Sequence, residues 1–180
     1  MVPKKAFLTK GFGVHKDKLA SFELALRAAK IEKFNLVSVS SILPPNCKIV
    51  PRNEGVKELE AGEIVHCVLA RNQTNEPHRL VASAVGTALP VNENNYGYIS
   101  EHHSFGENEY KAGEYAEDLA ATMLATTLGI DFDADSAWHE RERVYKASGH
   151  IFDTTHCCQI ANGDVEGRLT TTVAAMVFVE

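Results

Sequence analysis

Apolar residues recur at spacings of three and four in two segments, and each segment is predicted to form an amphipathic helix. The first covers residues 18–31 and follows Asp17, which is placed to cap its start. The second covers residues 114–128 and ends before Gly129, a residue type that often terminates helices. The apolar side of the first helix consists of Leu19, Phe22, Leu26 and Ala29. Both helices therefore have one side to bury.

Most of the remaining chain is β-branched or alternates apolar with polar residues, which is typical of strands. Strands are predicted over residues 35–42, 63–70, 79–89, 96–101, 141–147, 150–160 and 168–179. The segment Asn162-Gly163-Asp164 tolerates positive φ and lies between the last two strands, so we expect these strands to form a hairpin. Residues 71–78 are polar and are expected to form a surface loop.

Two helices cannot cover both faces of a single sheet of this size, which constrains the fold. We expect an α+β fold built as a four-layer α/β/β/α sandwich, with two mainly antiparallel sheets packed face to face and the helices outside. A chain of 180 residues fits a single domain over residues 1–180 with one core.

Composition then limits the partners. The chain carries 24 acidic and 18 basic residues, a net charge of −6 that disfavours nucleic acid and suits a cationic small molecule. No apolar run approaches the roughly 18 residues that cross a membrane, and the start of the chain lacks a signal-peptide core. We therefore expect a cytoplasmic protein with no membrane partner. The four cysteines lack CxxC spacing and are expected to be reduced thiols.

Two serines, Ser40 and Ser41, end the first predicted strand immediately before the double proline at residues 44–45. The hydroxyl of Ser41 could attack the preceding carbonyl and convert the peptide bond to an ester, if the backbone is strained and the developing oxyanion is stabilised. β-Elimination would then cut the chain and leave a pyruvoyl group in place of Ser41. Taken alone, two serines at a strand end more often mark a turn.

The surrounding residues favour the cleavage interpretation. The stretch Asn-Leu-Val-Ser-Val-Ser-Ser-Ile-Leu-Pro-Pro (residues 35–45) resembles the processing site of the pyruvoyl-dependent arginine decarboxylases, and the order of elements along the chain is similar to that family. The resemblance implies a proenzyme that is cut into a β fragment, residues 1–40, and an α fragment, residues 41–180. It further implies a homotrimer with each active site at a boundary between neighbouring subunits.

Three further positions match residues of the family. Asn35 matches an asparagine that supports processing and the active site, and its amide could donate to an oxyanion. Glu101 matches the catalytic glutamate, which would protonate the α-carbon after CO2 leaves. Glu23 matches an acidic residue that binds the substrate guanidinium, where the family pattern carries Asp. Without the resemblance, Asn35 would be a strand-start asparagine, Glu101 a solvated strand end and Glu23 a surface partner of Arg27.

The implied reaction converts L-arginine to agmatine, a polyamine precursor, and CO2. The covalent pyruvoyl cofactor would form a Schiff base with the substrate amine and accept electrons as the carboxylate leaves. Two alternatives stay open: a pyruvoyl decarboxylase of another amino acid, and an uncleaved, non-catalytic relative that acts as a binding module. The histidines and cysteines show no dense ligand spacing, so no metal site is predicted.

Overall fold

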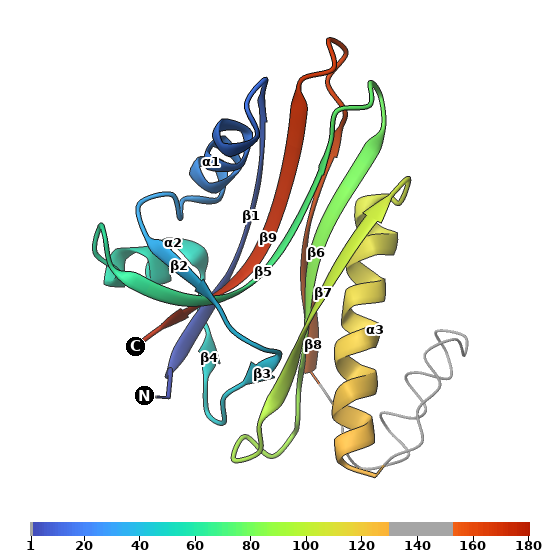
Figure 1. Ribbon diagram of the computed structural model, residues 1–180. Coiled ribbons are helices and arrows are strands. Elements are labelled where there is room, and N and C mark those ends of the chain that lie inside the picture. The colour runs from blue at the N-terminus through green and yellow to red at the C-terminus, as the bar shows by residue number, and fades with distance from the viewer. Residues whose placement is uncertain (1, 130–152) are drawn as a thin grey trace.

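The computed structural model describes residues 2–129 and 153–180, and the chain forms two sheets with a long helix on the outer face of each (Figure 1). One sheet has the strand order β2 (Asn35–Ser38), β5 (Ile64–Thr74), β9 (Leu169–Val179), β1 (Lys5–His15), β4 (Lys48–Ile49). The other has the order β3 (Ile42–Leu43), β7 (Gly97–Phe105), β6 (Leu80–Leu89), β8 (Asp153–Asn162). We call them sheet A and sheet B. The helices are α1 (Lys18–Ala29), α2 (Arg52–Gly55), a 3-10 turn (Val56–Glu58) and α3 (Glu109–Thr127).

The expected four-layer sandwich is confirmed. Helix α1 packs on β1 and β9 of sheet A, α3 packs on β6, β7 and β8 of sheet B, and the inner faces of the sheets meet. Sheet B is antiparallel throughout, whereas sheet A pairs β2 with β5 and β1 with β4 in parallel. In the described residues, no helix is both long and apolar enough to cross a membrane. All four cysteines are free thiols.

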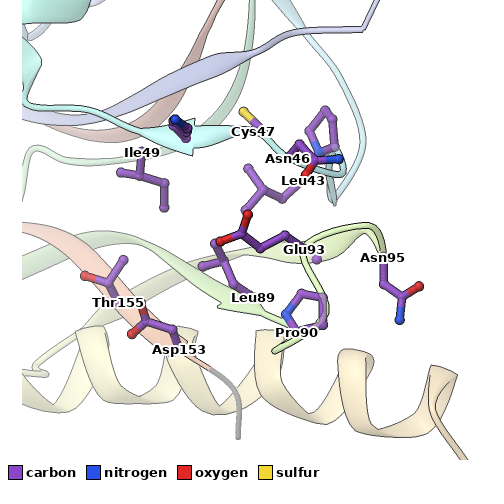
Figure 2. A pocket seen from close by; sticks show the side chains of 13 residues that line it. Leu43, Asn46, Cys47, Ile49, Leu89, Pro90, Glu93, Asn95, Asp153 and Thr155 are labelled. Atoms are coloured by element: carbon purple, nitrogen blue, oxygen red, sulfur yellow. The ribbon is translucent and has the colours of Figure 1, made fainter. Parts of the chain in front are cut away.

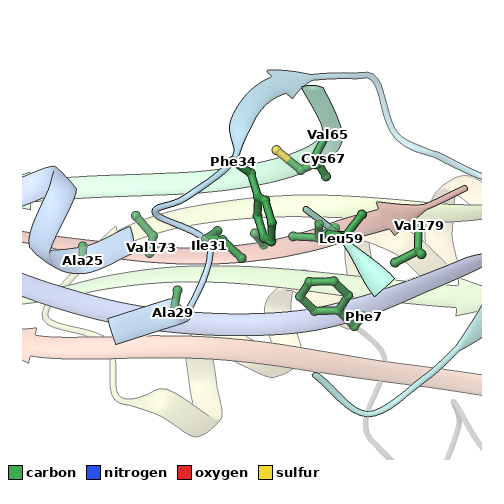
Figure 3. Packing of buried hydrophobic residues seen from close by; sticks show 12 residues of the cluster. Phe7, Ala25, Ala29, Ile31, Phe34, Leu59, Val65, Cys67, Val173 and Val179 are labelled. Atoms are coloured by element: carbon green, nitrogen blue, oxygen red, sulfur yellow. The ribbon is translucent and has the colours of Figure 1, made fainter. Parts of the chain in front are cut away.

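Separate apolar clusters hold these layers together. One cluster covers the outer face of sheet A, and Figure 3 shows Ala25 and Ala29 of α1 at one end of it, Phe7 and Leu59 at the other, and Phe34 between them. A second cluster fills the space between the sheets, with Leu43, Val85, Ile99, Met176 and Phe178 at its centre. Both sheets therefore exclude water from their inner faces, and any displacement of one sheet disturbs the other.

Several predicted boundaries are wrong. The strand predicted over residues 35–42 is two strands in different sheets, because β2 pairs with β5 and β3 pairs with β7. The last two strands form no hairpin: β8 pairs with β6 in sheet B, whereas β9 pairs with β1 and β5 in sheet A. The connecting Gly163 instead donates its N–H to the Arg79 carbonyl at 2.8 Å. Part of the predicted loop, residues 71–74, extends β5.

The structure also contains a strand that was not predicted, and its helix starts differ in detail from the prediction. Strand β1 was not predicted, although it pairs with β9 along its whole length. Helix α3 begins five residues earlier than predicted, because Asn108 caps it by accepting the Lys111 N–H at 2.8 Å. Asp17 occupies the N-cap position of α1 without a side-chain capping bond. The strand predicted over residues 141–147 and the start of that predicted over 150–160 lie outside the described residues.

Glycines and a histidine set the close approach of α3 to sheet B. A Cβ on Gly86 would lie 2.2 Å from the Ala116 carbonyl carbon, so only glycine lets the helix backbone approach β6 here. A Cβ on Gly113 of α3 would lie 2.4 Å from Cδ2 of the His156 ring, so glycine at this position lets the ring of this β8 residue pack against the helix. His156 Nδ1 lies 2.5 Å from Glu117 Oε1. This hydrogen bond raises the pKa of His156; burial acts in the opposite direction, and nearby carboxylates reinforce the rise.

The raised pKa of His156 predicts a pH-dependent contribution to stability. Because the folded state favours the imidazolium, the contribution is complete below the ordinary histidine pKa of about 6.5 and is lost as the pH rises through the raised value. His156→Gln should lower the free energy of unfolding by about 1 kcal/mol near pH 5.5 and by clearly less near pH 8.5. Urea unfolding at fixed protein concentration measures both losses. In a Glu117→Gln background, which lacks the largest cause of the raised pKa, the difference between the losses at the two pH values should shrink. Equal losses at the two pH values would contradict this account.

Candidate active site

Ser40 and Ser41 lie where the chain crosses from sheet A to sheet B. The last ladder bond in sheet A runs from the Val39 N–H to the Cys67 carbonyl, at 2.9 Å. The first bond in sheet B runs from the Ile99 N–H to the Ser41 carbonyl, at 2.7 Å. Figure 1 shows the crossing between β2 and β3. The two serines are therefore held between fixed points on two packed sheets.

The backbone turns sharply at Ser41. The Ile42 N–H donates to the Ser40 carbonyl oxygen at 3.0 Å, a hydrogen bond that spans three residues and defines a γ-turn. Ser41 has a negative φ, so this is the common inverse γ-turn and not the strained form. The φ angle of Ser41 therefore does not show the backbone strain that the sequence analysis set as a condition for the attack. The Ile42 N–H nevertheless points at the oxygen that would gain charge if Ser41 attacked the Ser40 carbonyl.

Glu101 shares a sheet face with Ser41. In the register of β3 and β7, Ser41 lies opposite Ile99, and directly opposed residues project to the same face. Glu101 is two residues beyond Ile99 in β7, so it projects to this face about 7 Å further along. Burial raises the pKa of Glu101 even though much of its side chain reaches solvent. Burial also raises the pKa of Cys67 to about 11, with a smaller contribution from the Glu101 charge.

His102 and His103 follow Glu101 and have different surroundings. His102 Nε2 lies 2.8 Å from Glu107 Oε2, and its ring packs against Tyr115 with centroids 4.3 Å apart. His103 projects to the same face as Glu101, and burial, aided by the charge of His102, lowers its pKa. His103 received no catalytic role in the sequence analysis. The available signal was its two-residue spacing from Glu101 in a strand.

Asn35 does not reach Ser40 within the chain. It begins β2, and its Nδ2 donates to the Gly62 carbonyl at 2.7 Å. The five steps along the strand from Asn35 to Ser40 span roughly 16 Å at the usual strand rise. Strand β2 is an edge of sheet A, and the exposed apolar side chains Val37 and Ile64 lie next to Asn35. The amide is therefore presented at a surface away from its own serines.

Glu23 lies on α1, outside sheet A, whereas Ser41 pairs with sheet B. Glu23 Oε1 is 2.5 Å from Arg27 Nε. This is the surface ion pair that the sequence offered as the alternative to substrate binding. Arg27 and Glu23 both retain large exposed fractions, 63% and 41% of their side chains. The structure thus places Ser41 and Glu101 on one face of sheet B, and places Asn35 and Glu23 elsewhere on the surface of the same chain.

A pocket of about 460 Å³ opens between the turn after β3 and the loop that joins β6 to β7 (Figure 2). The Asn46 N–H donates to the Glu93 carbonyl at 2.9 Å and ties the two loops together. Lys48, Glu93 and Asp153 supply charge to a wall that also contains Leu43 and Leu89. None of the predicted site residues lines this pocket, so it is separate from the candidate active site.

Known proteins resemble the chain over nearly its whole length. Residues 5–180 match the family model described as pyruvoyl-dependent arginine decarboxylase (PvlArgDC). The chain is 82% identical over 179 residues to "Pyruvoyl-dependent arginine decarboxylase 2" of Methanosarcina mazei, covering 99% of this chain and 98% of the relative. The relative from Methanococcoides burtonii is 74% identical over 179 residues, 99% of each chain. A "Probable pyruvoyl-dependent arginine decarboxylase" of Chloroherpeton thalassium is 59% identical over 177 residues, 98% of this chain and 97% of the relative.

The turn at Ser41 predicts how cleavage depends on one backbone donor. Ile42→Pro removes the N–H that donates to the Ser40 carbonyl and should slow cleavage of the Ser40–Ser41 bond about 100-fold or more. Ile42→Ala keeps the N–H and trims an exposed side chain, so it should cleave at nearly the unmodified rate. Intact mass against time after synthesis measures both. Fast cleavage of a folded Ile42→Pro chain would refute the role of this donor.

Proposed function

Because the chain belongs to the pyruvoyl-dependent arginine decarboxylase family, we propose that it cuts itself between Ser40 and Ser41 and converts L-arginine to agmatine and CO2. It is then a carbon–carbon lyase made as a proenzyme. One domain, residues 1–180, yields the fragments 1–40 and 41–180, and residue 41 becomes the covalent pyruvoyl cofactor. The observation that carries the proposal is the turn at Ser41, with a backbone donor on the Ser40 carbonyl.

The cleavage follows from groups already in place. Ser41 Oγ attacks the Ser40 carbonyl carbon, and the Ile42 N–H stabilises the oxygen as it gains charge. The C–N bond breaks as the C–O bond forms, which leaves an ester. Loss of the Ser41 Cα proton and cleavage of its Cβ–Oγ bond then release Ser40 as a carboxylate. Residue 41 takes up water and loses ammonia to become the pyruvoyl group.

The pyruvoyl group supplies an electron sink that an α-amino acid lacks when its carboxylate leaves. The Ile99 N–H holds the residue 41 carbonyl and so fixes the sink against β7. Glu101 lies on the same face, and its raised pKa enlarges the protonated fraction near neutral pH. We assign Glu101 to protonate the α-carbon after CO2 leaves.

Recognition of arginine requires a neighbouring subunit in this proposal. Asn35 and Glu23 lie away from Ser41 in their own chain, so they can serve only the Ser41 of another copy. Exposed apolar side chains beside Asn35 and on α1, including Val37, Ile64 and Leu19, support burial against such a copy. We propose a homotrimer in which Glu23 of one subunit binds the guanidinium at the neighbour's site.

The names of the relatives favour arginine over other amino acids, and the turn at Ser41 favours a cleaved enzyme over an uncleaved binding module. Agmatine as product suits a role in polyamine biosynthesis. The four free thiols suit the cytoplasm, where thiols stay reduced.

Paired variants separate cleavage from decarboxylation. The purified chain should give two fragments, residues 1–40 and 41–180, by intact mass. Ser41→Ala should abolish both the cut and the release of CO2 from arginine. Glu101→Gln should be cut normally, because the carboxyl is not needed for the ester, but should lower kcat about 100-fold or more. Undiminished decarboxylation by an intact chain would overturn the proposal, and an unchanged kcat in Glu101→Gln would overturn the proton-donor role.

Complementation tests the shared site. Glu23→Ala and Ser41→Ala should each be inactive alone, because every site lacks one component. Co-expressed in equal amounts, they should recover about a quarter of the unmodified activity, since that fraction of boundaries combines an intact Glu23 with an intact Ser41 from the neighbour. CO2 release from arginine measures the recovery, and native mass spectrometry counts the mixed trimers. Mixed trimers without activity would show that Glu23 and Ser41 do not share a site.

A further inference from the structure

A second pocket, of about 420 Å³, lies directly beside Ser40. Its wall comes from the start of the chain, the crossing segment, β5 and the end of β9, and consists of Pro3, Val39, Ser40, Ile42, Pro44, His66, Phe178 and Glu180. Glu101 is not part of this wall. The volume is many times that of a water molecule, about 30 Å³ in the liquid, so a chain end and its hydration can enter.

Among the described residues that line this pocket, only His66 and Glu180 carry ionisable side chains. His66 Nδ1 lies 3.7 Å from Glu180 Oε1, and each side chain is about two-fifths exposed, at 38% and 39%. His66 of β5 pairs with Val37 of β2. The next residue of β5, Cys67, accepts the hydrogen bond from the Val39 N–H. An imidazole is thus fixed close to the point where the crossing segment leaves sheet A. The proposed reaction makes no use of it.

We infer that this pocket receives the new carboxylate of Ser40 after the chain is cut, and that His66 is its counter-ion. The inference rests on the proposed self-cleavage. Breaking the Cβ–Oγ bond of Ser41 leaves the electron pair on the departing Ser40 carboxylate, so one negative charge appears at the wall of the pocket. Within the part of the wall that the structure describes, His66 is the only basic side chain. As imidazolium, it would lie between this charge and Glu180 and offset their repulsion.

The movement required is local. Val39 stays bound to the Cys67 carbonyl, so only Ser40 has to rotate away from residue 41. The movement also has a consequence for the reaction. A carboxylate left beside residue 41 would repel the carboxylate of an incoming amino acid, whereas one paired with His66 would not. His66 is accordingly a positioning residue for the cut chain end and takes no part in the chemical steps.

Trimming of the cut end tests the inference. The processed protein is treated with a broad-specificity carboxypeptidase near pH 6, and loss of Ser40 from the 1–40 fragment is followed by mass. His66→Gln should lose Ser40 about threefold to tenfold faster than the unmodified protein, the range expected for one partly exposed ion pair. His66→Lys restores a cation and should restore slow trimming. His78→Gln, on an exposed loop outside the pocket, is the matched control and should behave as unmodified.

The outcomes distinguish this inference from the proposed function. If the unmodified protein yields no 1–40 fragment, self-cleavage itself is wrong and the carboxylate never forms. If the fragment forms and His66→Gln is trimmed at the unmodified rate, self-cleavage stands and the counter-ion role is overturned. Fast trimming of both His66→Gln and His66→Lys would also overturn it, because the effect would then come from the shape of the histidine and not from its charge.

Discussion

The crossing of the chain between two packed sheets at Ser40 and Ser41 is the constraint on which the rest of the site depends. Val39 is bound to β5 of sheet A and Ser41 to β7 of sheet B, so the intervening peptide cannot relax by moving either end. The core between the sheets, with Leu43 and Ile99 on one side and Met176 on the other, keeps the two anchors at a fixed separation. A tight turn at Ser41 then places one backbone N–H on the Ser40 carbonyl. Preorganised donors of this kind need no reorganisation when charge develops.

In the proposed homotrimer, the same geometry would divide the site between subunits. The groups proposed to act on the peptide bond and on residue 41 belong to β3 and β7, which meet at the crossing. Asn35 lies at the other end of an extended strand, and Glu23 lies on the outer face of sheet A. An extended strand cannot bring its own ends together, so the chain cannot complete the proposed site alone. Assembly would then complete the site and bury the apolar edge of β2.

The sequence predicted the layers better than the connections between them. Helical spacing located α1 and α3, and alternation located β6, β7 and β9, because these elements each bury one face within a single layer. The crossing was missed because the residue pattern of 35–42 predicts a strand throughout, and nothing in that pattern states that Ser38 and Ile42 pair with different sheets. The predicted hairpin of the last two strands was wrong for a similar reason, because the sequence does not state that β8 and β9 belong to different sheets. Ser41 and Glu101 were proposed from a motif, whereas the Ile42 donor is a backbone group that every non-proline residue carries, so only the turn suggests a role for it.

A cut at this position need not weaken the fold, because each new fragment is already anchored by long-range contacts. The 1–40 segment contains β1, which pairs with β9 over its whole length, and α1, whose buried Ala25 and Ala29 belong to the apolar cluster on sheet A. Its last strand, β2, stays paired with β5. Breaking one peptide bond adds conformational freedom only to the few residues between Val39 and Ile42, a small entropic gain beside these contacts. A bond between two independently anchored strands is therefore one that a folded protein can lose while its site keeps its shape.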